Sequence, residues 1–180
     1  QSISKSKETA YVYLQFYFRS NPDKTYKLVE QMTNIGSQNE TDRSWFLVKE
    51  TVNDVNKYKI IFINGFESAT NAKKNRLVEI AESMSISIRE LEVLIGDFLM
   101  SIKHNHVLSF DRVEVNFEKD RILFVQNYSK DGSLRDLIRR TKPEESWDVK
   151  SRALESKSSI SIKTVREYTK QIIAGLIYLN

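Results

Sequence analysis

The 180-residue chain has no cysteine, which excludes a disulfide framework and any metal site built on thiolates. The lack of cysteine fits an intracellular chain, so we expect a cytoplasmic location. Long apolar runs are also missing. The best candidate, residues 93–100, is short beside the roughly 20 residues of a membrane span and contains Asp97. No signal-peptide pattern opens the chain, and we expect no membrane-spanning segment within these residues.

Charge and length leave the function open. The net charge of +4 is mild and permits an acidic partner or a peripheral membrane contact, but a solvated surface is the favoured interpretation. The length suits one domain, or one domain with an extension. Because the chain opens on Gln1 rather than Met, we expect it to be a fragment of a longer protein.

The first part of the chain predicts one helix followed by three strands. Aromatic residues at helical spacing predict a helix over 9–19, after a polar and loose start at 1–8. Strand patterns follow at 27–33, 45–50 and 58–63. The short polar connection NDVN between the second and third strands is typical of a hairpin. We therefore expect an antiparallel meander.

The second part predicts helices around two further strands. Ser87 and Glu90 have the spacing of a capping box, which predicts a helix ending near residue 103, after a shorter helix within 67–86. The remaining predicted elements are strands at 107–117 and 121–127, a short helix capped by Ser133 and Asp136, a loop at 144–160 and a final helix starting at Thr164 and Glu167. The predicted fold class is α+β, with a helix packed on one face of a five-stranded antiparallel sheet.

Three segments resemble a known family. They are FYFRSNP followed by MTNIGS and SWFLVK, then DGSLRDLIRRTKP, and finally VREYTKQIIAGLIYL. They resemble the slowpoke-binding proteins and the PX-domain-containing kinase-like proteins, while residues 51–100 match poorly. The resemblance implies a helical extension at 1–26, a protein-kinase-like small lobe at 27–128, and the hinge with the start of a truncated helical large lobe at 129–180. No PX domain is visible in the sequence, which favours a slowpoke-binding-like member or a fragment cut after that domain.

The resemblance implies a catalytically inactive adaptor, a pseudokinase that binds other proteins. Family members act as adaptors for membrane channels and trafficking. The implied partners are therefore a potassium channel and a phosphopeptide-binding adaptor such as 14-3-3, and the implied location is cytoplasmic with membrane association. The segment 148–163, rich in Ser, Lys and Arg, fits a phosphorylatable loop that such an adaptor would read.

An active kinase needs a glycine-rich loop over the phosphates and a third-strand lysine paired with a helix glutamate. The corresponding turn has only Gly36, beside two acidic side chains that would repel a triphosphate. Aligning KYKIIFI with the kinase pattern Val-Ala-Ile-Lys puts Ile61 in the lysine position. Counting back from His104 puts Ile95 in the glutamate position. Two facing apolar residues would close the site as hydrophobic core, so no cofactor is expected and ATP is the open alternative.

The alternative is a weak or atypical ATP-binding kinase. Lys59 lies two residues before Ile61 and points to the same face of the strand. Glu92 lies one helical turn before Ile95, so Lys59 and Glu92 form the ion pair in this interpretation.

At the hinge, Gln126 takes the gatekeeper place and is followed by Asn127 and Tyr128, whose backbone groups could bind an adenine edge. The catalytic loop and the metal-binding aspartate of kinases are not in the chain, which ends at Asn180. The enzyme question therefore stays open, with an inactive protein favoured.

Other chemistry has little support in the sequence. His104 and His106 have no third ligand nearby, so no metal site is expected. The basic helix that carries Arg139 and Arg140 could meet lipid headgroups, but a solvated helix face is favoured. Aromatic residues are not interleaved with this patch, so we expect no nucleic-acid partner.

Overall fold

The computed structural model describes residues 2–32, 43–65, 71–142, 145 and 160–180. The described helices are α1 (Ser2–Arg19), α2 (Asn71–Ser83), α3 (Ile88–Ser101), α4 (Leu134–Arg139) and α6 (Ile162–Leu179). The described strands are β1 (Thr25–Met32), β2 (Arg43–Val52), β3 (Val55–Gly65), β4 (Arg112–Asn116) and β5 (Arg121–Asn127).

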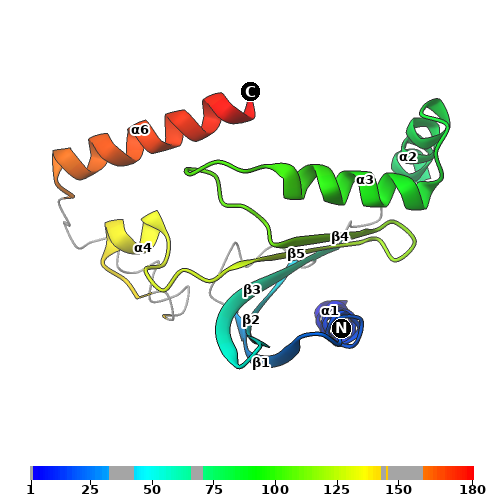
Figure 1. Ribbon diagram of the computed structural model, residues 1–180, viewed down its shortest axis with the longest axis horizontal. Helices are drawn as coiled ribbons and strands as arrows, with labels where there is room; N and C mark the ends of the chain where they lie inside the picture. Colours follow the sequence, from blue (N-terminus) through cyan, green and yellow to red (C-terminus); the bar gives the residue numbers. More distant parts are fainter. Residues whose placement is uncertain (1, 33–42, 66–70, 143–144, 146–159) are drawn as a thin grey trace.

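The five strands form one antiparallel sheet in the order β1-β2-β3-β5-β4 (Figure 1). The first three strands follow one another as a meander, α2 and α3 lie between β3 and β4 in the chain, and β5 pairs with both β3 and β4. This is the layout that the resemblance implies for a kinase-like small lobe. The predicted α+β class with a five-stranded antiparallel sheet is confirmed.

The turn between β2 and β3 consists of Asn53 and Asp54, which have φ angles of 48° and 62°. Two successive positive φ angles characterise a type I′ turn, whose twist matches that of the flanking strands. Asn and Asp tolerate this backbone region better than most residues. The turn brings Val52 opposite Val55 and fixes the register of the hairpin. The predicted tight hairpin is therefore confirmed.

Helix α1 packs on one face of the sheet and closes the main hydrophobic core. Leu14 is fully buried, and Ala10 and Tyr17 lie one helical turn away on the same side of the helix and are buried as well. The strand residues of this core are Phe46, Val48, Ile61, Ile63, Leu123 and Val125. The N-terminal helix is therefore part of the core of the sheet.

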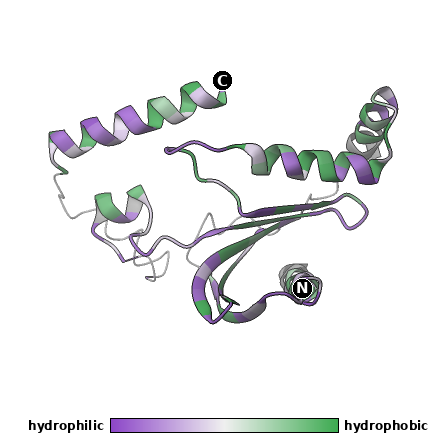
Figure 2. Cartoon of the chain, in the orientation of Figure 1, coloured by the Kyte–Doolittle hydropathy of each residue, from purple (hydrophilic) through white to green (hydrophobic). Residues whose placement is uncertain are grey.

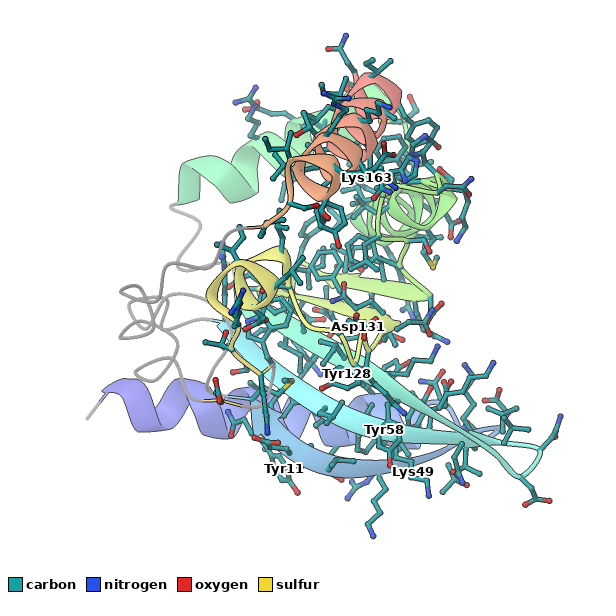
Figure 3. All side chains as sticks on the ribbon, turned by 90° about the vertical axis from the view of Figure 1, so that its left-hand side faces the viewer. Tyr11, Lys49, Tyr58, Tyr128, Asp131 and Lys163 are labelled. Atoms are coloured by element: carbon teal, nitrogen blue, oxygen red, sulfur yellow. The ribbon has the colours of Figure 1, made fainter. Side chains whose placement is uncertain are left out.

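The opposite face of the sheet points toward α3, α4 and α6 (Figures 1 and 3). The capping box predicted at the start of α3 is present, with Ser87 and Glu90 bonded to each other's backbone N–H groups. Helix α3 lies against β4, because Gly96 lacks a Cβ that would stand 3.1 Å from the carbonyl oxygen of Val113. Glycine thus permits the close approach of helix and strand.

Helix α6 docks on the connection between α3 and β4. A Cβ on Gly175 would lie 2.9 Å from the carbonyl oxygen of His106, so only glycine fits this contact. The hydroxyl of Tyr178 accepts a hydrogen bond from the backbone N–H of Lys103. Figure 2 shows hydrophobic residues along the C-terminal part of this helix. Within the described ranges, no helix combines the length and apolar character needed to traverse a bilayer.

Three boundary predictions are corrected. Helix α1 begins at Ser2 rather than at residue 9, so the start of the chain is helical rather than loose. The predicted strand 107–117 is strand only in β4, because the segment before it forms a bridge between His104 and Val107 and then a loop that contacts α6. Helix α6 begins at Ile162, with Ser161 as its cap.

Replacing Leu14 with Ala tests the packing of α1. We expect a loss of about 2–5 kcal/mol in the free energy of unfolding, because the truncation leaves a cavity in a closed core. Chemical denaturation measures it. The control is Val12→Ala on the exposed side of the same helix, with an expected change within about 0.5 kcal/mol. Equal losses in the two variants would show that α1 does not cover the sheet.

Candidate functional site

Strand β3 presents different side chains to the two faces of the sheet. Because successive residues of a strand alternate and Ile61 points to α1, the side chains at every second position from Asn56 to Asn64 point to the side of α3. These residues are Asn56, Tyr58, Ile60, Phe62 and Asn64. In β3, all of which is described, no lysine points to the face where a kinase holds its nucleotide.

Aromatic rings occupy that face instead. Phe62 stacks on Trp45 across β2, with 4.1 Å between ring centroids, and on Phe124 across β5, at 5.7 Å. Phe110 adds a fourth ring, 4.9 Å from Phe124. The row follows the strand register, in which Phe62 lies opposite both Trp45 and Phe124. This face therefore offers an aromatic surface where a kinase presents an ammonium group.

The structure corrects the alignment of the third strand. Ile61, expected to face Ile95 of α3, is fully buried in the core beneath α1. Lys59 does share its face, as alternation predicts, so both side chains lie on the side away from α3. The residue of β3 that lies within the aromatic row is Phe62. In this register the residues of β3 that point toward α3 include no lysine.

Lys59 is the centre of a buried polar cluster under the end of α1. Its side chain is 7% exposed, and its Nζ lies 2.6 Å from Asp111 Oδ2 and 2.7 Å from Asn127 Oδ1. Glu50 Oε2 lies at 3.9 Å. A buried ammonium group is tolerated only when it is paired and hydrogen-bonded, and these oxygens from three other parts of the chain meet that requirement.

The cluster continues from Glu50 toward α1. Glu50 Oε1 accepts hydrogen bonds from Lys24 Nζ at 3.0 Å and from the hydroxyl of Tyr26 at 3.1 Å. The hydroxyl groups of Tyr26 and Tyr17 lie 3.2 Å apart, and their rings are 5.4 Å apart. Burial raises the pKa of both tyrosines, which keeps these hydroxyls protonated and able to donate.

Glu92 serves the hairpin between β4 and β5 rather than Lys59. Its carboxylate accepts a hydrogen bond from the backbone N–H of Phe117 at 2.6 Å. The predicted ion pair of Lys59 and Glu92 is therefore absent. Lys59 binds Asp111 and Asn127 on the side of α1, and Glu92 binds the hairpin on the side of α3. Ile95 is half-buried on α3.

The predicted hinge residues lie at the end of β5, which includes Gln126 and Asn127, and directly after it, at Tyr128. Gln126 lies opposite Ile60 on the face toward α3, and Asn127 binds Lys59 on the other face. The backbone N–H of Tyr128 donates to the carbonyl oxygen of Tyr58 at 3.2 Å. Figure 3 shows these two tyrosines close together on adjoining segments. Gly36 lies outside the described residues.

The two histidines are structural. His104 Nδ1 accepts from the backbone N–H of His106, and the His104 ring stacks on Tyr178 of α6 at 4.9 Å. Across the described ranges, no group of three or more His, Asp or Glu side chains could hold a metal ion.

In the basic helix α4, Arg140 forms the left-handed C-cap. The side chain of Arg139 and most of 148–163 fall outside what the structure describes.

Comparisons with known proteins give partial matches. No protein-family model matches the chain. The chain is 34% identical over 98 residues to a Dictyostelium discoideum protein named probable inactive serine/threonine-protein kinase slob1. That match covers 46% of this chain and 17% of the relative. Among solved structures, the chain is similar to Rad53 residues 1–466 in complex with AMP-PNP, with 14% identity and a TM-score of 0.47.

The structural match covers 86% of this chain and 30% of the Rad53 chain. The chain thus spans less than a third of the length of either protein. The partial similarity to a protein named as an inactive kinase agrees with a kinase-like chain.

Two members of the lysine cluster have no signature in the sequence. Asp111 and Glu50 carry no motif, and their only signal is that Lys59 sits on the buried side of an apolar strand and therefore needs a carboxylate. Lys59 lies two residues before Ile61 and therefore shares its face of the strand. The sequence does not say which carboxylate pairs with it.

Replacing Lys59 with Met tests the cluster. We expect a loss of about 1–3 kcal/mol in the free energy of unfolding, because the buried carboxylate of Glu50 and the side chain of Asn127 would lose an ammonium neighbour, while the partly exposed Asp111 would turn to solvent. The matched variant Lys57→Met, at an exposed position of the same strand, is expected to change stability by at most about 0.5 kcal/mol. Urea denaturation measures the free energy of unfolding. If Lys59→Met were as stable as the wild type, the proposed contribution of the cluster to stability would be wrong.

The raised pKa of Tyr13 leads us to expect that the protein loses stability at alkaline pH. Burial and the carboxylates of Glu114 and Glu92 raise its pKa from 10.0 to about 12. In this pH window the unfolded chain releases the proton while the folded chain keeps it, so the free energy of unfolding falls as pH rises. Tyr13→Phe removes this contribution and makes the fall shallower, whereas Tyr11→Phe, at an exposed position, leaves it unchanged. Parallel curves for the wild type and Tyr13→Phe would refute the prediction.

Proposed function

We propose that this chain is the small lobe, hinge and first large-lobe helices of a catalytically inactive kinase-like protein that acts by binding other proteins. The observation that carries the proposal is the composition of β3. Its side facing α3 has Phe62 in an aromatic row, while Lys59 is held on the opposite face by Asp111 and Asn127. The similarity to a protein named as a probable inactive kinase supports it.

The physical reason lies in what phosphoryl transfer demands. The reaction depends on positioned positive charge around the phosphates. For Lys59 to supply it, the ammonium group would have to leave three oxygen partners and cross to the other face of its own strand, which alternation forbids without a register shift. Trp45, Phe62 and Phe124 offer no charge to a triphosphate. An adaptor function needs only the folded surface.

The partners follow from the resemblance alone. A potassium channel and a 14-3-3-type reader of phosphorylated peptides remain the proposed protein partners, and membrane association would come with the channel. ATP is not proposed as a cofactor.

A calorimetric titration with Mg-ATP tests the proposal. We expect no saturable heat up to about 1 mM nucleotide, because β3 has no ammonium group on its face toward α3 and Lys59 is held on the other face by Asp111 and Asn127. Micromolar binding that requires magnesium would overturn it. The variants Lys59→Met and Lys57→Met separate the alternatives in that event, because a kinase using Lys59 loses binding only in the first.

A further inference from the structure

Helix α1 is linked to the hinge end of the sheet by two chains of polar contacts. The first chain starts at Tyr17, whose hydroxyl lies 3.2 Å from that of Tyr26, which donates to Glu50 at 3.1 Å. Glu50 in turn lies 3.9 Å from the ammonium group of Lys59. Tyr17, Glu50 and Lys59 are all buried.

The second chain starts at Asn21, just after α1, which is 4% exposed. Its Nδ2 donates to the carbonyl oxygen of Tyr17 at 2.8 Å, and its Oδ1 accepts from the guanidinium of Arg112 at 2.7 Å. Arg112 also lies over the Tyr17 ring and pairs with Glu114 at 2.8 Å. Its neighbour in the chain is Asp111, the closest partner of Lys59.

Both chains meet at Lys59, and Lys59 binds the residue that starts the hinge. Asn127 ends β5 and accepts from Lys59 at 2.7 Å. The next residue, Tyr128, donates its backbone N–H to Tyr58, the neighbour of Lys59 in β3. The backbone N–H of Asp111 is anchored on the carbonyl oxygen of Val125 in β5. One ammonium group therefore links α1 to the segment that joins the sheet to α4.

We propose that α1 is a strap whose docking on the sheet holds the hinge at Asn127 and Tyr128 in place, and whose release loosens it. The strap has no backbone ladder to the sheet. It is held by the apolar contacts of its buried face and by the polar contacts of Tyr17 and Asn21. When it lifts, Glu50 and Lys59 regain water, and this hydration offsets part of the lost packing.

Packed interfaces have discrete arrangements and do not deform continuously, so the strap has two states, docked and released. The released state changes the hinge because Lys59 then shares its donors with solvent rather than with Asn127 and Asp111. The strap transmits the position of an N-terminal helix to the joint between sheet and helices, whether or not a nucleotide binds.

Amide hydrogen exchange on the whole chain tests the strap. The variant Tyr17→Phe with Asn21→Ala removes the polar contacts of the strap and keeps the aromatic ring in the core. We expect exchange at the Tyr128 N–H to rise about tenfold or more, while the amides in the middle of the β2–β3 ladder, such as Ile61, keep their protection. Tyr17→Phe alone, a milder change, is expected to shift Tyr128 in the same direction by a smaller factor.

The matched control is Thr51→Val, which removes the exposed hydrogen bond from Thr51 to Asn56 near the turn of the same sheet. It is expected to leave Tyr128 exchange unchanged. The proposal is overturned if neither strap variant changes the exchange at Tyr128, or if exchange rises by the same factor at Tyr128 and Ile61. The second result would mean that the contacts only add to global stability.

Discussion

A charge removed from water constrains how this sheet can be built. Lys59 needs oxygen partners because an unpaired ammonium group in the interior costs several kcal/mol, and it finds them in Asp111, Asn127 and Glu50. These residues come from the position just before β4, the end of β5 and from β2. A slip of one residue in any of these strands would turn the partner to the other face. The cluster therefore specifies register as well as stability, and α1 can cover this end of the sheet only because the charges are satisfied.

The two faces of β3 carry different side chains within this kinase-like layout. Ile61 and Lys59 serve the side of α1, and Phe62 with its stacked neighbours serves the side of α3. In an ordinary kinase the third strand has a lysine on the side that faces the helix. Here Lys59 lies on the first side, where Asp111, Asn127 and Glu50 surround its ammonium group. Glu92 accepts a hydrogen bond from the backbone N–H of Phe117 in the β4–β5 hairpin.

Local patterns predicted the elements well because each has a local cause. The capping box of Ser87 and Glu90, the Asn53–Asp54 turn and the β5 boundaries all follow from residues close together in the chain. The site was harder to predict because its register depends on what covers each face. Nothing in KYKIIFI says that Ile61 faces an N-terminal helix rather than α3, and an alignment to a lysine pattern shifts by one without any local penalty. The partners of Lys59 lie between 9 and 68 positions away in the sequence, beyond the reach of periodicity.

Gly175 sets a limit on how the chain can change over evolutionary time. Its contact with the His106 oxygen joins the helical part to the connection after α3 through a backbone atom and a missing side chain. Tyr178 supports the same joint, with a hydrogen bond from the backbone N–H of Lys103 and a ring contact with His104. The glycine itself cannot be replaced by a larger residue without moving the helix. Sequences that share this joint would therefore keep a glycine at this position, and the spacing from that glycine to the His104–His106 turn would help to align them.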